Sequence, residues 1–245
     1  MRSLIKGPPP ANVSPPTQQQ RSLAQADAEY QVNIASIVDK TARVEHARTQ
    51  FDSMHKRHLR DLLFVEQRYL CVYCERPIDE VHPPPPVDHW NPLSLFLQEV
   101  FNWSNLHLSC RTVDTCDDRK GHRPVDLPWP VTFQYENVFG FTSGGRMYVR
   151  TDVTVTPQIR QALAIALEDQ PGPPSIRSTL HLNQPALRAA REAAIEAEET
   201  FAESQPGMTA TQRQQRVASL LAQPRRETFI SARLAYLSGQ LGAGQ

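Results

Sequence analysis

Two pairs of cysteines constrain the fold of this chain more than any other feature of its sequence. Cys71 and Cys74 are separated by two residues, and Cys110 and Cys116 follow further along the chain. In the reducing compartment that we expect for this chain, four thiols are better explained as metal ligands than as two disulfides. Four thiolates form the closed tetrahedral site of a structural zinc. The sequence therefore predicts one zinc that ties two segments together, with all four cysteines as its ligands.

The spacing of the second pair leaves an alternative open. A two-residue spacing forms a tight turn that points both sulfurs at one ion, but Cys110 and Cys116 have five residues between them, which is longer than usual. Some of the four cysteines could instead be small buried hydrophobic residues. In that case His107 is the candidate to replace a cysteine at the zinc.

Four polar residues between and after the cysteine pairs point to phosphodiester chemistry. Cleavage of that bond needs a base to activate water, a divalent ion to stabilise the phosphate and the leaving oxygen, and a group that holds the base in place. His89 suits the role of base, because a neutral imidazole accepts a proton near neutral pH. Asp88 and Asp117 offer the hard oxygen ligands that magnesium or manganese prefers. The side chain of Asn105 can bridge a loop backbone and fix the orientation of the histidine.

The order of these motifs resembles that of the zinc-supported HNH endonucleases. In that family a CxxC pair is followed by Asp/Glu-His, then Asn, then Cys with His, Asn or Asp, and a Lys-Gly. The segment is similar, more specifically, to the PtuB-like nuclease subunits of Septu and retron-Septu antiphage defence systems. The matching motifs lie within residues 60–123 and are Cys71-Val72-Tyr73-Cys74, Asp88-His89-Trp90-Asn91-Pro92, Trp103-Ser104-Asn105-Leu106 and Ser109-Cys110.

The resemblance implies a role for each of the four polar residues. His89 falls at the position of the general base, Asn105 at that of the loop-orienting asparagine and Asp88 at that of the metal carboxylate. Asp117 falls at the last HNH position, where it departs from the more usual His or Asn. The long spacing before Asp117 could shift the register by one residue, which makes Asp118 the alternative metal ligand.

The charge of the chain argues against a broad DNA-binding surface. The sequence has 26 basic and 26 acidic residues, so its formal net charge is zero. Contact with nucleic acid would then depend on local clusters, such as residues 55–60 and 119–123, or on a partner. No apolar run approaches the length that crosses a bilayer, and the N-terminus lacks the apolar region of a signal peptide, so we expect cytoplasmic localisation. His82 and His122 are expected to be surface or supporting residues.

Composition divides the chain into four regions. Residues 1–20 are predicted to be a flexible proline-rich arm. Residues 21–63 are an N-terminal helical region, and residues 64–130 are the nuclease core with its zinc site. Residues 131–245 contain a β-hairpin followed by a C-terminal helical scaffold or docking region.

The last region carries two local patterns. Aromatic and β-branched residues on both sides of Ser143-Gly144-Gly145 predict a hairpin that turns at the glycines. Alanine-rich charged segments predict two long helices, over 185–203 and 209–237. The predicted fold class is α+β, mainly α-helical, with a small zinc-supported ββα-metal (HNH) core and a β-hairpin.

Three functions agree with this reading. The first is an HNH endonuclease that cuts DNA, for which the resemblance implies an ABC-type ATPase partner of the RecN/SMC class and a role in antiphage defence. The second is a catalytically silent, zinc-stabilised binding module, and the third is a stand-alone restriction or homing-type nuclease or an RNase. The joint presence of Asp88, His89, Asn105 and Asp117 favours catalysis, because a scaffold needs none of them.

Overall fold

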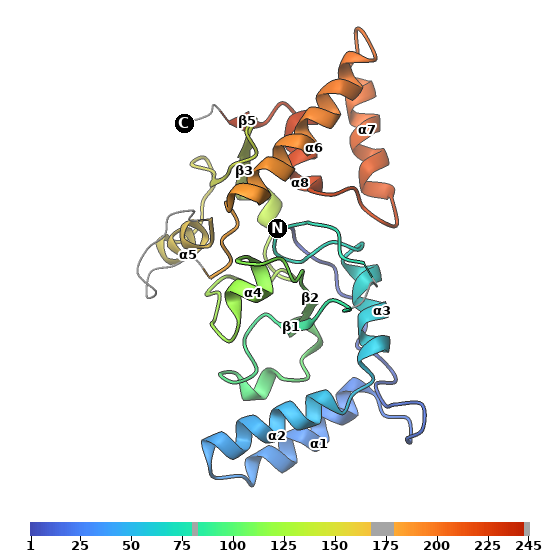
Figure 1. Ribbon diagram of the computed structural model, residues 1–245, viewed down its shortest axis with the longest axis vertical. Coiled ribbons are helices and arrows are strands. Elements are labelled where there is room, and N and C mark those ends of the chain that lie inside the picture. Colours follow the sequence, from blue (N-terminus) through green and yellow to red (C-terminus); the bar gives the residue numbers. More distant parts are fainter. Residues whose placement is uncertain (80–82, 168–178, 243–245) are drawn as a thin grey trace.

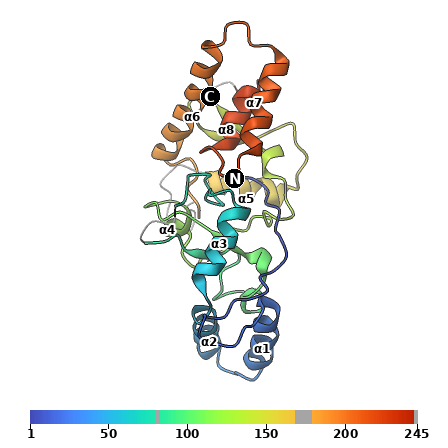
Figure 2. The same ribbon diagram turned by 90° about the vertical axis from the view of Figure 1, so that its right-hand side faces the viewer.

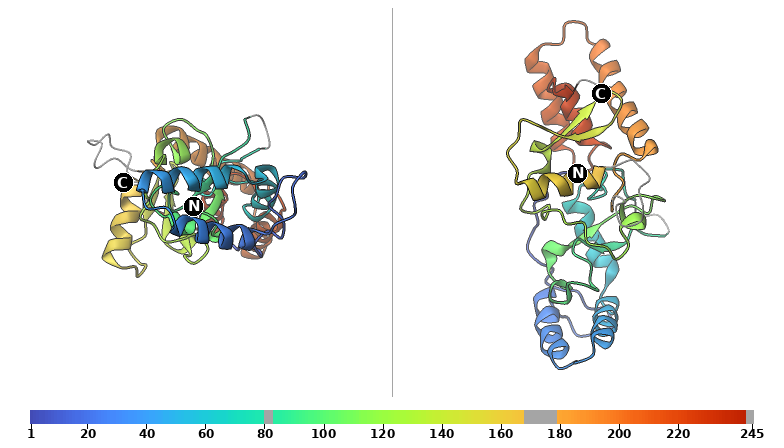
Figure 3. Two further views of the ribbon diagram at one scale, coloured as in Figure 1. Left: turned by 90° about the horizontal axis from the view of Figure 1, so that it is seen from below. Right: turned by 90° about the vertical axis from the view of Figure 1, so that its left-hand side faces the viewer.

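The computed structural model describes residues 1–79, 83–167 and 179–242, so His82 lies outside the described residues. The molecule is elongated, with a helical hairpin at each end and short strands between them (Figure 1). The N-terminal hairpin consists of α1 (Leu23–Ala35) and α2 (Lys40–Asp52), and α3 (Lys56–Glu66) leads from it to the middle of the molecule. Seen from below, α1 and α2 run alongside each other (Figure 3, left).

Local sequence signals start the first two helices. The Ser22 hydroxyl accepts a hydrogen bond from the backbone N–H of Gln25, and the backbone N–H of Ser22 donates one to the Gln25 side chain; together these bonds form a capping box. Asp39 caps α2 by accepting a hydrogen bond from the backbone of Ala42. The buried side chains of α1 recur every three or four residues, which gives the helix one apolar face; they are Leu23, Ala26, Tyr30 and Ile34.

Two strands and a helix form the middle of the molecule. Strand β1 (Val87–His89) pairs antiparallel with β2 (Leu106–Leu108), so that Asp88 lies opposite His107. The connection between them contains the 3₁₀ turns η1 (Leu97–Glu99) and η2 (Trp103–Asn105). Helix α4 (Cys116–Lys120) follows β2. The order strand, strand, helix is the order that a ββα unit requires.

The second half of the chain begins with the predicted hairpin. After η3 (Tyr135–Asn137), β3 (Phe139–Thr142) pairs antiparallel with β4 (Met147–Val149), and the turn between them contains Gly145 at φ 68°. A Cβ at this glycine would collide with the Arg188 backbone, so the turn needs glycine both for its dihedral angle and for its contact with the next helix. Strand β5 (Leu241–Gly242), which the sequence did not predict, adds in parallel to the other edge of β3.

The C-terminal helices differ in one respect from the prediction. Helix α5 (Pro157–Leu167) precedes α6 (Pro185–Glu203), which has the predicted bounds. The predicted helix over 209–237 is wrong, because it is divided into α7 (Ala210–Ala222) and α8 (Ile230–Leu237). Gln223 precedes Pro224 and has extended backbone angles, as residues before proline prefer. The views in Figure 2 and Figure 3 (right) show α6 and α7 as a hairpin at the end of the molecule opposite α1 and α2.

The proline-rich N-terminal segment lies against the core, which differs from the flexible arm expected from its composition. It contains no helix or strand before Leu23. The Met1 and Val13 side chains are buried, and the Lys6 ammonium donates a 2.6 Å hydrogen bond to the Leu106 carbonyl. The segment therefore contributes side chains to the core although its prolines exclude regular structure.

The predicted α+β class, mainly helical with small sheets, is confirmed. Among the described residues, each helix is too short or too polar to span a bilayer.

Candidate active site

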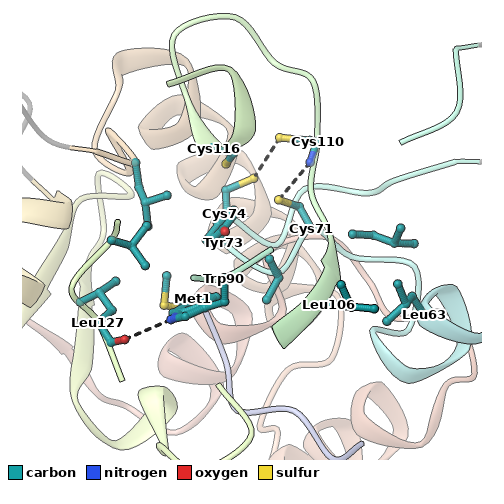
Figure 4. Packing of buried hydrophobic residues seen from close by; sticks show 14 of the residues in the cluster. Met1, Leu63, Cys71, Tyr73, Cys74, Trp90, Leu106, Cys110, Cys116 and Leu127 are labelled. Carbon is teal, nitrogen blue, oxygen red and sulfur yellow. Dashed lines mark hydrogen bonds between the residues drawn. The ribbon is translucent and has the colours of Figure 1, made fainter. Parts of the chain in front are cut away.

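The four cysteines meet in one buried cluster. Cys71 and Cys74 lie in the turn after α3, Cys110 follows β2, and Cys116 is the first residue of α4. All four ligand sulfurs lie within 4.8 Å of one another (Figure 4). The Cys74 and Cys110 sulfurs are 3.7 Å apart, and the Cys110 backbone N–H donates to the Cys71 sulfur at 3.3 Å.

Both open questions about this cluster are answered by its geometry. Cys116 joins it despite the long spacing, because the chain turns through left-handed backbone angles at Asp114 (φ 58°) and Cys116 (φ 51°). His107 is not a member. It is fully buried against the Trp90 ring, with centroids 5.8 Å apart. The alternative in which His107 replaces a cysteine is therefore wrong.

The chemistry of the cluster fits a metal ion. Burial raises the pKa of the Cys71 and Cys116 thiols, whereas hydrogen bonds from the neighbouring thiols lower the pKa of Cys110. Four thiolates at such close range would repel one another strongly in a dry interior. A soft divalent cation removes that repulsion and takes sulfur ligands by preference.

A cavity of about 350 Å³ lies between β1, α2 and α4. Figure 1 shows β1 and α4 in the middle of the molecule and α2 at its lower end. The polar side chains that line the cavity come from all three elements and from the residues that follow them, and they are Arg48, Asp52, Asp88, His89, Ser94, Asp117, Lys120 and His122. Three of the four predicted site residues, Asp88, His89 and Asp117, therefore share one cavity.

Asp88 is buried on β1 and both of its carboxylate oxygens accept hydrogen bonds. The Lys120 ammonium donates to Oδ1 at 2.9 Å, and the Tyr73 hydroxyl donates to Oδ2 at 2.7 Å. Lys120 and Tyr73 were not predicted as site residues. Lys120 is the lysine of the Lys-Gly pair noted in the sequence, and Tyr73 lies inside the CxxC pair, but neither position signals a contact with an aspartate on β1.

His89 follows Asp88 on the same strand and is held by two contacts. Its Nε2 lies 3.0 Å from the Val100 carbonyl oxygen, and its ring packs on Phe51 of α2 with centroids 4.5 Å apart. Because a carbonyl only accepts, Nε2 carries the proton and Nδ1 is the basic nitrogen. Burial lowers the pKa of His89 to about 4, so the ring is neutral at physiological pH.

Asn105 is fully buried at the end of η2 and fixes the loop between β1 and β2. Its Oδ1 accepts from the Asn91 backbone at 2.7 Å. Its Nδ2 donates to the carbonyls of Asn91 (3.1 Å) and Glu99 (3.0 Å). These bonds bridge the loop that carries Val100, the partner of His89. Asn105 thus has the geometry of a loop-orienting residue and does not line the cavity itself.

Asp117 and Asp118 lie in different environments. Asp117 and Lys120 are three residues apart on α4, so they share a helix face and both line the cavity. Burial, and then the nearby Asp88 charge, raises the pKa of Asp117 to about 6. Asp118 is exposed, and its Oδ2 accepts the Asp114 backbone N–H at 2.8 Å. The geometry places Asp117, and not Asp118, beside Asp88.

The four cysteines offer a full set of metal ligands, whereas Asp88 and Asp117 offer only part of one. Among the described residues, the four cysteines form the one group of three or more closely spaced metal-ligand atoms. Asp88 and Asp117 alone would leave most positions around a magnesium or manganese ion to water and substrate oxygens. Such partial coordination by protein is usual for magnesium.

Helix α2 contributes a wall of the cavity that sequence reasoning missed. Arg48, Phe51 and Asp52 line the cavity together with the residues of β1 and α4. They lie well before the recognisable motifs in the chain, and nothing in their local pattern indicates that they reach the site.

No protein-family description matches the chain, and no curated protein is significantly similar to it. The function therefore has to be inferred from the chemistry of the site.

Proposed function

We propose that this protein is a metal-dependent endonuclease of the HNH type that hydrolyses phosphodiester bonds in DNA. The observation that carries the proposal is the meeting of Asp88, His89 and Asp117 in one cavity. A base, two carboxylates and a loop-orienting asparagine are the groups that this reaction needs. No structural role requires all of them at one place.

Each residue has a task that its environment supports. His89 accepts a proton from the attacking water, because burial keeps its ring neutral and Nε2 is already engaged with Val100. Asp88 and Asp117 supply oxygen ligands to magnesium or manganese. When bound, that ion supplies positive charge to the phosphate and the leaving oxygen. Asn105 positions His89 through the loop that carries Val100.

The cysteine cluster has a structural task in this proposal. Four buried sulfurs leave no open position for substrate, which is typical of structural zinc rather than catalytic zinc. We infer that zinc joins the turn after α3 to α4, so that Asp117 is held at a fixed place relative to β1.

The resemblance to PtuB-like subunits extends the proposal to a partner. An ABC-type ATPase of the RecN/SMC class would bring the nuclease to DNA, and the pair would act in antiphage defence. The zero net charge of the chain supports reliance on a partner for much of the DNA contact. An ATPase gene next to the gene of this chain would support the partnership; a nuclease gene standing alone would favour a restriction or homing-type enzyme.

The decisive test is cleavage by the purified chain, with and without the ATPase. Supercoiled plasmid and single-stranded RNA are incubated with Mn²⁺, Mg²⁺ or EDTA. We expect cleavage of DNA that needs the ion and that falls roughly 10²–10⁴-fold in His89→Ala, because the proton acceptor is lost. Asn105→Ala should lose less than His89→Ala. His58→Ala, a histidine of α3 that does not line the cavity, is the matched control.

Three outcomes would revise the proposal. Cleavage of RNA alone would make the protein an RNase. Zinc-containing, folded protein that cuts neither substrate would make it a binding module. Equal cleavage by wild type and His89→Ala would remove His89 from the mechanism.

A further inference from the structure

One buried cation touches the predicted metal carboxylate directly. The Lys120 side chain is 1% exposed and that of Asp88 is 8% exposed. The Lys120 ammonium donates to Asp88 Oδ1 at 2.9 Å and to the His89 backbone carbonyl at 2.6 Å. Lys120 therefore contacts both residues of the Asp-His pair, although it comes from a helix 31 residues further along the chain than His89.

Lys120 is held in this place. It occupies the last residue of α4, and Gly121 ends the helix with a positive φ of 52°. Because Lys120 is buried, its ammonium has little access to water. Separating a buried ammonium from its carboxylate partner strongly destabilises the fold. The ammonium cannot leave Asp88 at low cost when another cation arrives.

Asp88 still has capacity for a metal ion. Each carboxylate oxygen has two lone-pair directions. Lys120 takes one on Oδ1 and Tyr73 takes one on Oδ2. A divalent ion in the cavity can therefore bind a remaining lone pair, but it does so next to an ammonium group of like charge.

We propose that Lys120 is the resident counter-cation of Asp88: it neutralises and orients this carboxylate before the divalent ion binds, and its charge keeps the affinity for that ion low. The inference rests on the proposed function, because it takes Asp88 as the metal ligand. Lys120 acts through Asp88 and is a positioning residue. Tyr73 assists as a neutral hydrogen-bond donor to the second oxygen.

The test measures thermal stability with and without the ion, so that it does not depend on cleavage. Wild type, Lys120→Met and Lys40→Met are melted in divalent-free buffer and again with Mn²⁺. Lys40 is an exposed lysine at the start of α2, and its replacement removes the same charge from a remote site. Methionine is an unbranched side chain that is one heavy atom shorter than lysine, so it keeps most of the packing but leaves Asp88 without its cation.

We expect the Tm of Lys120→Met in divalent-free buffer to fall by roughly 6–20 °C. Mn²⁺ should then raise its Tm by about twice as much as it raises that of wild type, because Asp88 has only the ion as a cation. Lys40→Met should behave as wild type does. An unchanged Tm for Lys120→Met without the ion, or an equal gain from Mn²⁺ in both proteins, would overturn the role of Lys120.

Two further variants keep the test decisive if Lys120→Met does not fold. Tyr73→Phe removes one donor to Asp88 and should show the same two effects at smaller size. In Asp88→Asn/Lys120→Met both charges are gone, so the fold should recover and the gain from Mn²⁺ should disappear. A double variant less stable than Lys120→Met would overturn the pairing. A gain from Mn²⁺ that survives in the double variant would instead place the ion away from Asp88, which contradicts the proposed function and not the ion pair.

Discussion

At the scale of single residues, the two carboxylates of the cavity differ in how they meet the nearby cations: Asp88 is hydrogen-bonded directly to Lys120, whereas Asp117 feels Lys120 and Arg111 only through their charge. Asp88 is buried and accepts hydrogen bonds from Lys120 and Tyr73. Burial of Asp117, and then the nearby Asp88 carboxylate, raises the pKa of Asp117 to about 6. In the proposed nuclease, a proton and the divalent ion would therefore compete for Asp117.

This competition predicts a pH dependence. As the pH falls through about 6, Asp117 becomes protonated and loses the charge that attracts the ion. At subsaturating Mn²⁺ we expect cleavage by wild type to fall about tenfold for each pH unit below that value. We call this fall in cleavage below about pH 6 the acid limb of the profile. Asp117→Asn should cleave more slowly than wild type but should lack the acid limb, because the asparagine amide offers an oxygen ligand and does not titrate.

Asp118→Asn is the matched control for that prediction. Asp118 is exposed and bonded to its own loop, so its variant should keep the wild-type rate and pH profile. If Asp118→Asn loses the acid limb while Asp117→Asn keeps it, the register of α4 in solution is shifted by one residue. The activity–pH profiles of the three proteins decide between these outcomes.

At the scale of elements, local patterns were enough where the signal lies within one segment. The turn between β3 and β4 and the bounds of α6 follow from nearby residues. The cysteine cluster was predicted from its two pairs, although it joins segments that lie far apart in the sequence. The contribution of α2 could not be predicted, because it depends on how a helical hairpin folds back on the loop after β1. The hydrogen bond from Tyr73 to Asp88 was missed for the same reason, since it joins two separate turns.

The wall formed by α2 leads to a prediction about substrate binding. Arg48 is an exposed arginine that lines the cavity with Asp88 and His89, a place from which it can contact a phosphate of the substrate. In Arg48→Met we expect weaker binding of a DNA duplex. The slope of log K against log [salt], where K is the association constant for the duplex, should be shallower by about 1 than in wild type. Fluorescence anisotropy at several salt concentrations, without a divalent ion, measures this slope.

Lys40→Met is again the suitable control, since Lys40 lies on the same helix about 12 Å along its axis from Arg48. It should leave the slope unchanged. An equal effect of both substitutions would indicate general attraction by the helix rather than a contact made at the cavity.

At the scale of the whole molecule, the cysteine cluster lies where the two halves of the chain meet. The Phe229 backbone donates to the carbonyl of Glu75, next to Cys74, and Ser231 of α8 donates to the Glu75 carboxylate. The backbone of Cys116 donates to the Leu180 carbonyl, just before α6. The C-terminal helices thus attach to both ends of the cluster. No local pattern predicts these attachments, because their partners lie far apart in the sequence.

From this arrangement we expect loss of the metal to affect the entire chain. We expect one zinc per chain and a single cooperative melting transition in wild type, and we expect Cys71→Ser to lose both, as measured by elemental analysis and by thermal melting. The reason is that the proposed ion would join the turn after α3 to α4, while α6 and α8 are hydrogen-bonded to those same two segments. Val113→Ser changes an exposed residue between Cys110 and Cys116, so its zinc content and Tm should match wild type. Folded wild-type protein without zinc, or a Cys71→Ser variant that still melts cooperatively at the wild-type temperature, would show that the cluster is not a structural metal site.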